Sequence, residues 1–309
     1  MTNSDLIPLG ARPIDRAGHH RSDPDWLEAA YAREDVLILV MRRGLPLVAP
    51  GGGLVWMGPE VAKAAPEARR LFLGLDKQGT PVFAAGLGDA FDFDASLMAG
   101  TGEFTDFRMA MGKLSELEAN LASTARSIFE WHKSHRFCAA CGAENEIGEA
   151  GWKSVCPACE AQHFPRTDPV AIMLATSGDK CLLGRQKAFP AGMWSCLAGF
   201  IEPGETLEQG AARELHEEAG ITCHPANAEY LCCQPWPFPS SLMIGLLLPA
   251  ENEDITVDKS ELEAARWVTR DEMREILKGE HPEIFAPPPF AVAHHIMKVW
   301  AERPSTGSG

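Results

Sequence analysis

Positive charge is scarce in this chain. Its 309 residues include 28 lysines and arginines against 43 aspartates and glutamates, which gives a formal net charge of −15 at pH 7. Proteins that cover duplex nucleic acid need a broad basic surface to neutralise the phosphates. We therefore expect no such surface here, although the composition leaves room for a locally basic cleft.

Long apolar runs and a secretion signal are also missing. No apolar stretch reaches the roughly 18 residues that a membrane-spanning helix needs. Residues 1–10 lack the basic patch and apolar run with which a signal peptide begins. We therefore expect a cytoplasmic protein without a membrane partner.

Neither a disulfide scaffold nor an internal repeat is indicated. The chain has nine cysteines, but it is long and shows no secretion signal. Cysteines in such chains are more often metal ligands or small buried side chains than disulfides. No segment of the sequence visibly repeats another.

The first part of the chain is typical of a β-rich domain. With 45% hydrophobic residues, the sequence is long enough for more than one core. Short apolar runs at 36–41 and 81–85 are separated by glycine and proline, as at 50–53, and predict strands joined by turns. Residues 114–133 contain few helix breakers and predict a helix.

A different pattern begins at Asp168. Runs at 170–175 and 181–183 predict two strands joined by a turn at 177–180. Further predicted elements are a strand at 193–198, a helix at 206–219 that stops at Gly220, a strand at 242–248, and helices at 271–277 and 290–302. Strands interleaved with helices indicate a mixed α/β domain.

These patterns predict four segments and an α/β (α+β) fold class. They are a β-rich N-terminal domain at 1–130, a cysteine-rich segment at 131–166, an α/β domain at 167–303, and a disordered tail at 304–309.

A glutamate-rich helix carries the clearest chemical signal. The sequence reads Gly-Phe-Ile-Glu-Pro-Gly-Glu at 199–205 and Arg-Glu-Leu-His-Glu-Glu-Ala-Gly-Ile at 213–221. Helix positions three and four apart share a face, so Glu214, Glu217 and Glu218 fall within one narrow arc. Oxygen-rich clusters of this kind suit Mg²⁺ or Mn²⁺. Such an ion can neutralise phosphate charge and lower the pKa of an attacking water.

The residues around these glutamates favour a built site over a solvated acidic helix face. Arg213 can pair with a carboxylate, while Gly199 and Gly204 suit a loop that turns tightly before the helix. Three apolar positions can pack inward, namely Ala212, Leu215 and Ala219. A solvated acidic helix face does not explain why Glu205, Arg213 and the glycines occur at this fixed spacing from the three glutamates.

Four cysteines have the spacing of a structural zinc site. Cys138 and Cys141 form one Cys-x-x-Cys pair, and Cys156 and Cys159 form another after 14 intervening residues. Two such pairs supply four thiolates for tetrahedral Zn²⁺ and leave no ligand position open, which favours a structural role with one ion per chain. Two disulfides, or four unrelated buried thiols, are the alternatives.

A third motif, Gln-Pro-Trp-Pro-Phe-Pro-Ser-Ser at 234–241, lies downstream of the glutamates. A zinc ribbon, a complete G-x5-E-x7-R-E-U-x-E-E-x-G-U box and this array, in this order, resemble the NADH pyrophosphatases, the NudC-type branch of the Nudix hydrolases. The resemblance is strong from about residue 130 to 300 and weaker before that. A rigid surface turn is the alternative interpretation of the array taken alone.

The resemblance implies a fold and an activity. The fold is a C-terminal Nudix α/β/α sandwich preceded by a zinc ribbon and a β-rich domain. The activity is metal-dependent hydrolysis of the pyrophosphate of NAD(H) to nicotinamide mononucleotide and AMP, and removal of NAD caps from RNA. It further implies a homodimer.

The resemblance also assigns site residues. It maps metal ligands onto the side chains of Glu214, Glu218 and Glu261 and the backbone carbonyl of Ala198, with Glu217 as a further ligand or the base. It maps substrate contacts onto Phe164, Gln234, Pro235, Trp236, Pro237, Phe238, Pro239, Ser240, Ser241 and Ala293, and Phe200 resembles a ring that stacks on a base. A solvated position for Glu261 and core packing for Phe200 are the alternatives.

Two residues depart from the family pattern. Phe164 stands where a tyrosine is usual, so ring stacking is kept and a hydroxyl contact is lost; Cys233 stands where serine is frequent.

Two competing functions remain open. One is a broader nucleoside-diphosphate hydrolase acting on ADP-ribose or diadenosine polyphosphates, and the other is a nucleotide-sensing zinc-ribbon protein without turnover.

Overall fold

The structure is a computed structural model that describes residues 7–10 and 14–304. Contacts divide the described chain into two units. The C-terminal unit comprises residues 7–10, Asp168–Pro235 and 241–304, and the N-terminal unit comprises residues 14–167 and Trp236–Ser240. The predicted disordered tail lies outside the described residues, apart from Pro304.

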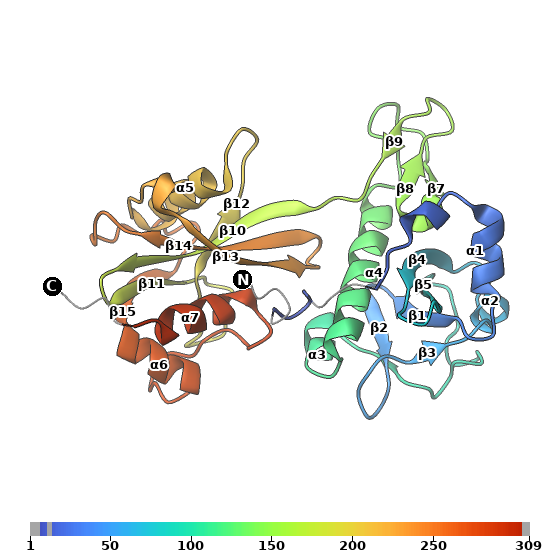
Figure 1. Ribbon diagram of the computed structural model, residues 1–309, viewed down its shortest axis with the longest axis horizontal. Helices are drawn as coiled ribbons and strands as arrows, with labels where there is room; N and C mark the ends of the chain where they lie inside the picture. Colours follow the sequence, from blue (N-terminus) through green and yellow to red (C-terminus); the bar gives the residue numbers. More distant parts are fainter. Residues whose placement is uncertain (1–6, 11–13, 305–309) are drawn as a thin grey trace. The chain divides into compact units, whose positions relative to one another are not determined.

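The C-terminal unit is an α/β/α sandwich (Figure 1). Its elements are β10 (Asp168–Ser177), β11 (Lys180–Arg185), β12 (Leu197–Phe200), α5 (Leu207–Ala219), β13 (Glu229–Trp236), β14 (Ser241–Pro249), β15 (Ala264–Thr269), α6 (Arg270–Lys278) and α7 (Val292–Glu302). The sheet order is β13-β14-β10-β11-β15, with β12 paired to β10. The pair β10 and β14 is parallel, whereas β11 and β12 run antiparallel to their neighbours.

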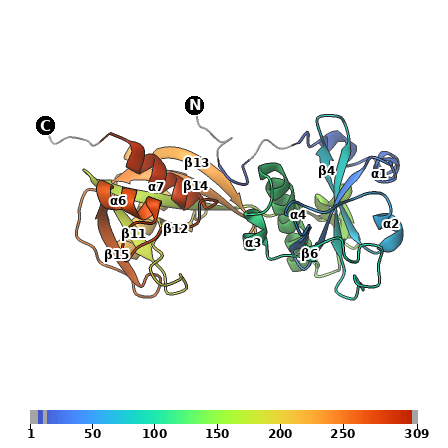
Figure 2. The same cartoon turned by 90° about the horizontal axis from the view of Figure 1, so that it is seen from below.

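Alternation along β10 explains the two helical layers. Ala171 and Met173 pack in the cluster that contains the buried residues of α5, whereas Ile172 and Leu174 pack with α6 and α7. Successive strand residues point to opposite faces, so a strand that is apolar on both faces requires a helix layer on each side. Figure 2 shows α6 and α7 together over one part of this unit.

The N-terminal unit contains a second sheet and the cysteine-rich segment. Its elements are α1 (Pro24–Tyr31), β1 (Leu37–Arg42), β2 (Leu45–Val48), β3 (Trp56–Met57), α2 (Val61–Ala64), β4 (Arg69–Leu75), β5 (Pro81–Leu87), β6 (Glu103–Phe104), α3 (Phe107–Met111) and α4 (Glu116–Ser134). The three short strands β7 (Glu146–Gly148), β8 (Lys153–Val155) and β9 (Gln162–His163) form a separate antiparallel sheet.

The two six-stranded sheets have the same architecture. The N-terminal sheet has the order β4-β5-β1-β2-β6 with β3 paired to β1, and its β1 and β5 are parallel. Each strand therefore corresponds to one strand of the C-terminal sheet, with β1 in the place of β10 and β5 in the place of β14. No repeat is visible in the sequence, and the correspondence between the sheets appears only in the strand order. The two sheets share topology and strand orientation without visible sequence similarity.

Most predicted elements are confirmed within one or two residues. The clearest difference is the predicted strand at 193–198, because β12 begins only at Leu197. Met193 and Ser195 form isolated bridges instead. The guanidinium of Arg185 donates to the carbonyl oxygens of Pro190 and Met193, which holds this segment as a loop.

Candidate functional site

The glutamate helix α5 begins and ends where its capping residues predict. The Thr206 side chain accepts a hydrogen bond from the backbone N–H of Gln209, and the Gln209 side chain accepts from the Thr206 N–H. This capping box satisfies two of the unpaired N–H groups at the helix start. Gly220 ends the helix with φ of 70°, a left-handed conformation that glycine adopts without strain. Leu215 and Ala219 are fully buried, as predicted, and anchor the helix to the sheet.

Gly199 of β12 is required by a close approach. A Cβ atom built there would lie 1.9 Å from the carboxyl carbon of Glu214, far inside contact distance. The Glu214 carboxylate therefore rests against the strand where any other residue would place a side chain. Its side chain is only 13% exposed, and burial raises its pKa above the usual range.

Arg213 connects the loop before α5 to the glutamates. Its guanidinium makes ion pairs with Glu205 at 2.7 Å, with Glu214 at 2.9 Å and with Glu217 at 2.8 Å. It also donates to the backbone oxygen of Phe200 at 2.9 Å. The pairing with Arg213 lowers the pKa of Glu205 to about 2. Arg213 thereby fixes the loop and orients two carboxylates of the helix.

Glu218 is a buried carboxylate that lacks a partner. It is 2% exposed, and its Oε2 atom has no hydrogen-bond partner among the described residues. Burial, reinforced by the charges of Glu214 and Glu261, raises its pKa to about 8. An unpaired buried carboxylate is costly, whereas a coordinated cation would satisfy it. The residues at this position therefore fit a divalent metal ion.

A loop after β14 brings further acidic residues to the end of α5. The N–H of Asp258 donates to the backbone oxygen of Glu218 at 2.9 Å, and the N–H of Glu261 donates to the oxygen of Asp258 at 3.2 Å. Glu261 is exposed, and its charge acts on both Glu214 and Glu218. The charge of Asp258 also raises the pKa of Glu218, although Asp258 was not among the predicted site residues. Its position three residues before Glu261 was the available signal.

The carboxylates are near one another but not fully convergent. Within residues 7–10 and 14–304, the four-cysteine group alone brings three or more metal-binding atoms within 4.8 Å of one another. The Glu217 side chain is 58% exposed and pairs with Arg213. Like charges repel, and Arg213 competes for two of the carboxylates, which accounts for the open arrangement.

The cysteine-rich segment forms the predicted four-thiol cluster. Sulfur–sulfur distances are 3.7 Å between Cys138 and Cys159 and 3.4 Å between Cys141 and Cys156. A disulfide requires about 2.05 Å, so both pairs are free thiols at the spacing of shared metal ligands. The backbone N–H of Cys141 is the largest influence lowering the pKa of Cys138 to about 6, which favours the thiolate. The group fits tetrahedral Zn²⁺.

The two Cys-x-x-Cys segments, each of which forms a zinc knuckle, use the same backbone turn. Gly142 N–H donates to the Cys138 oxygen, and Glu160 N–H donates to the Cys156 oxygen, each at 2.9 Å. Both donors have positive φ, 78° for Gly142 and 61° for Glu160. A non-glycine residue in this conformation costs about 1 kcal/mol, and the second knuckle keeps it because the geometry of the cluster requires it.

Gln234 of β13 lies in the interior of the C-terminal unit. It is 0% exposed, and its amide nitrogen donates to the backbone oxygens of Pro8 and Phe290. Its amide oxygen accepts from the N–H of Val292 at 2.9 Å. The side chain therefore ties the strand to the start of α7 and to the segment 7–10.

The rest of the predicted substrate set is spread over several elements. Two rings are exposed, Phe164 at 62% and Phe200 at 59%, so core packing does not explain Phe200. Pro235 and Trp236 end β13, Pro237 to Ser240 form the turn, and Ser241 begins β14. Ala293 is buried in the first turn of α7, and Ala198 lies beside Gly199 in β12.

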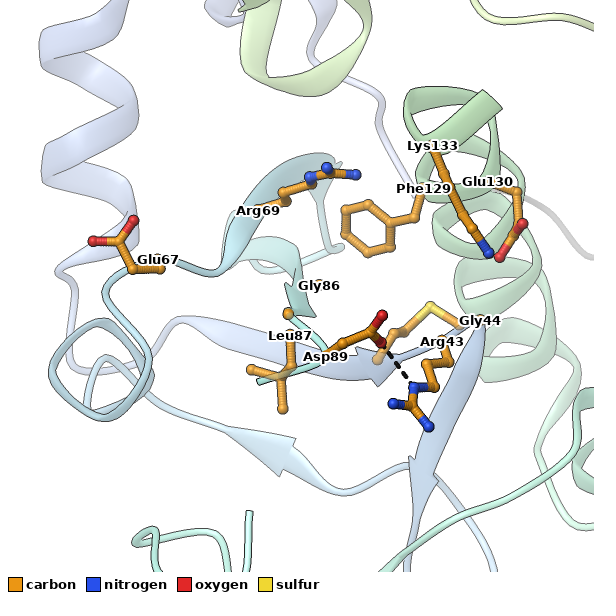
Figure 3. Close-up of a pocket in the computed structure, with 12 residues that line it drawn as sticks. Arg43, Gly44, Glu67, Arg69, Gly86, Leu87, Asp89, Phe129, Glu130 and Lys133 are labelled. Atoms are coloured by element: carbon orange, nitrogen blue, oxygen red, sulfur yellow. Dashed lines mark hydrogen bonds and ion pairs between the residues drawn. The ribbon is translucent and has the colours of Figure 1, made fainter. Parts of the chain in front are cut away.

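A cavity of about 560 Å³ in the N-terminal unit is distinct from the glutamates (Figure 3). Phe129 lies along one wall, and Arg43 bonds to Asp89 at 2.7 Å. The charged lining residues are balanced, with three basic and three acidic side chains, Arg43, Arg69, Lys133, Glu67, Asp89 and Glu130. The cavity therefore has no net charge that would select an anion.

The fold of the C-terminal unit and its carboxylate helix define a Nudix domain. Residues 165–286 match the family model described as NUDIX domain. Residues 36–131 match an NADH pyrophosphatase-like rudimentary NUDIX domain, and residues 133–164 match the NADH pyrophosphatase zinc ribbon domain. The chain belongs to the NADH pyrophosphatase (NudC-type) branch of the Nudix hydrolase family.

Relatives agree with this assignment over different lengths. The chain is 36% identical to the NAD-capped RNA hydrolase NudC of Mycobacterium bovis, covering 96% of this chain and 95% of that protein. It is 35% identical to the human mitochondrial NAD(P)H pyrophosphatase NUDT13, covering 91% and 86%. It is 47% identical to the human NAD-capped RNA hydrolase NUDT12 over 202 residues, which are 62% of this chain and 43% of that longer protein.

Proposed function

We propose that this protein hydrolyses the pyrophosphate bond of NAD(H), releasing nicotinamide mononucleotide and AMP. The observation that carries the proposal is the buried Glu218 carboxylate, which lacks a partner within a complete Nudix box. The array at 234–241 and two nearly full-length relatives, one named as an NAD(P)H pyrophosphatase and one as an NAD-capped RNA hydrolase, support NAD as the substrate.

The proposed metal is Mg²⁺ or Mn²⁺. Its ligands are Glu214, Glu218 and Glu261 with the backbone carbonyl of Ala198. When bound, the ion neutralises charge on the diphosphate and activates the attacking water. Glu217, whose side chain is 58% exposed, is a further ligand or the group that accepts the proton from that water. Arg213 holds Glu214 and Glu217 in place through its two ion pairs.

Aromatic surfaces are proposed to bind the flat bases. Phe164 and Phe200 expose their rings, and Trp236 and Phe238 supply two more. Stacking on such rings is tolerant of base identity, which suits a substrate with nicotinamide at one end and adenine at the other. Gln234, with its amide engaged by backbone groups, contributes by holding β13 rather than by direct contact.

NAD-capped RNA is the second candidate substrate. The observation that favours this substrate is that two relatives are named NAD-capped RNA hydrolases. ADP-ribose and diadenosine polyphosphates are the alternatives for a broader enzyme, and the complete set of box carboxylates speaks against a sensor without turnover.

We further propose one structural Zn²⁺ per chain, a homodimer and a cytoplasmic location. All nine cysteines are free thiols, as expected in a reducing compartment. No helix in the part of the chain that the structure describes is long and apolar enough to span a membrane. Elemental analysis of protein purified without chelator should find about one zinc per chain, and light scattering should give the mass of two chains.

Product analysis tests the activity directly. NADH, NAD⁺, ADP-ribose and NAD-capped RNA are incubated with the enzyme under identical Mg²⁺ or Mn²⁺, and the products are separated by chromatography. Nicotinamide mononucleotide and AMP should form fastest from an NAD-containing substrate. Preferential cleavage of ADP-ribose would favour the broader hydrolase, and no cleavage of any substrate would favour the sensor.

A further inference from the structure

The loop that carries the aromatic array belongs to the N-terminal unit by its contacts. Residues Trp236–Ser240 cluster with residues 14–167, although the flanking strands β13 and β14 belong to the C-terminal sheet. Neither the Nudix box nor the zinc ribbon accounts for this assignment. The side chains that contact the loop lie on α3 and α4.

Arg126 of α4 makes the largest set of these contacts. Its Nε donates to the backbone oxygen of Pro237 at 2.9 Å, and its Nη1 donates to the backbone oxygen of Gly44. Its guanidinium also lies 5.2 Å from the ring centre of Phe238. The Arg126 side chain thus contacts two adjacent residues of the loop, Pro237 and Phe238, and links the loop to the turn between β1 and β2.

Other groups of the same unit also contact the loop. The guanidinium of Arg108 stands 3.9 Å from the Phe238 ring centre, and the ring of Phe107 stands 6.0 Å from it. The Ser127 hydroxyl donates to the oxygen of Pro239 at 3.2 Å. Phe238 in turn packs against Trp236 at 5.1 Å between ring centres. Phe238 therefore lies between Trp236 and the side chains of α3 and α4.

The turn between β1 and β2 leaves room for Arg126. Gly44 has φ of 75°, and a Cβ there would lie 2.7 Å from the Arg126 Nη1 atom and 3.1 Å from a carboxylate oxygen of Glu130. Arg126 is also half-buried, and this burial lowers its pKa. A charged donor that is partly shielded from water gives stronger hydrogen bonds than an exposed one.

We propose that Arg126 is a positioning residue for substrate recognition, which holds the Trp236–Ser240 loop in its binding conformation. This rests on the proposed function, because it takes the array as the part of the protein that selects NAD(H). It assigns a role to the N-terminal unit: this unit, which lacks the glutamates, sets the conformation of the aromatic loop. Arg126 does not contact the reacting atoms, so its loss should affect binding rather than the chemical step.

The test compares Arg126→Ala with Lys133→Ala, a matched removal of a cation two turns further along α4. Steady-state kinetics on NADH should show KM raised roughly tenfold in Arg126→Ala with kcat within about twofold, since a lost charged hydrogen bond has about that effect. Lys133→Ala should match the wild type. Arg126→Lys keeps the charge but not the two-pronged contact, and should fall between the two.

Hydrogen–deuterium exchange provides a readout that does not depend on activity. The peptide containing residues 236–241 should exchange faster in Arg126→Ala than in the wild type or in Lys133→Ala. A merely structural role would instead lower the melting temperature and kcat with KM unchanged. If Arg126→Ala fails to fold, Arg126→Lys and Ser127→Ala are measured in the same way.

Unchanged exchange in the loop, or faster exchange with unchanged KM, would overturn the proposal. Failure of the proposed function is seen separately. If the wild type does not cleave NADH, or if Trp236→Ala leaves KM unchanged, the array does not select this substrate, whatever the exchange data show for Arg126.

Discussion

The two sheets of this protein share one strand order but differ in the helix that follows their third strand. After β12 comes α5, 13 residues long, with Glu214, Glu217 and Glu218. After β3 comes α2, which has four residues, Val-Ala-Lys-Ala, and no acidic side chain. Pro66 follows soon after α2 and disfavours its extension. The same sheet architecture therefore occurs with and without the glutamates of the proposed metal site, and the helix with its preceding loop makes the difference.

A second contrast lies in what each unit buries. The C-terminal unit buries a carboxylate without a partner, Glu218, whereas the N-terminal unit buries a histidine, His132, at 4% exposure. The Nε2 atom of His132 is 2.8 Å from the backbone oxygen of Gly151. The Nδ1 atom of His132 has no hydrogen-bond partner among the described residues, so this buried ring is only half satisfied. Burial lowers the pKa of His132 to about 4, which keeps the ring neutral, and an unpaired neutral nitrogen costs less to bury than the unpaired carboxylate of Glu218.

The largest effect should come from Glu218→Gln. This change keeps the size of the side chain and removes its charge, so kcat for NADH should fall about 100-fold or more. The melting temperature without metal should be equal or higher, because an unpaired buried carboxylate is relieved. Steady-state kinetics and thermal melts measure both, with Glu60→Gln beside α2 as the control. Near wild-type turnover at saturating Mg²⁺ would remove Glu218 from the metal site.

Gly199→Ala should have the next largest effect. The added methyl group would occupy the place of the Glu214 carboxylate, so kcat should fall roughly 10- to 100-fold while the protein remains folded. Gly58→Ala, after the corresponding strand β3, meets only the flexible end of Glu60 and should leave turnover unchanged. Equal kinetics for both variants would show that the position of Glu214 is not critical.

Trp236→Ala should act on binding more than on turnover. If the ring supplies binding energy equally in the ground state and the transition state, KM for NADH should rise about tenfold with little change in kcat. Tyr230→Ala removes another aromatic ring of β13, which is 46% exposed, and should leave KM unchanged. A fall in kcat without a change in KM would place Trp236 in the chemical step instead.

The smallest predicted effect is a pH dependence of stability in the N-terminal unit. Burial lowers the pKa of His132 from 6.5 to about 4, so the folded state holds the neutral ring. The folded state is therefore not penalised by His132 above pH 6.5. As the pH falls from 6.5 toward 4, His132 binds a proton in the unfolded chain but not in the folded one, so the free energy of unfolding decreases. Between pH 7 and 5.5 the free energy of unfolding should fall by about 1 kcal/mol from this residue.

The comparison with His132→Gln isolates this contribution. Glutamine keeps a donor for the Gly151 oxygen and does not titrate. Urea unfolding of both proteins at each pH gives the difference, and parallel pH profiles would show that His132 does not cause the loss.

The elements with strong local signals were predictable. The apolar runs of β10 and β14 and the capping and stop residues of α5 lie close together in sequence, so their outcome depends on few distant contacts. The strand predicted at 193–198 was wrong in its first half, because Arg185, some eight residues away, holds that segment as a loop. The repeated sheet was missed because topology is kept by strand pairing, which different apolar sequences satisfy equally well.

The sequence by itself determined the class of chemistry. Helical periodicity aligns Glu214, Glu217 and Glu218, and the Cys-x-x-Cys spacing shapes each zinc knuckle, since both depend on residues only a few positions apart. Only the tertiary structure decided which of these groups are buried. It placed Glu214 against Gly199, left Glu218 without a partner, and assigned the Trp236–Ser240 loop to the unit that contains Arg126. Burial and long-range hydrogen bonds join residues that are distant in sequence, and no local pattern encodes those encounters.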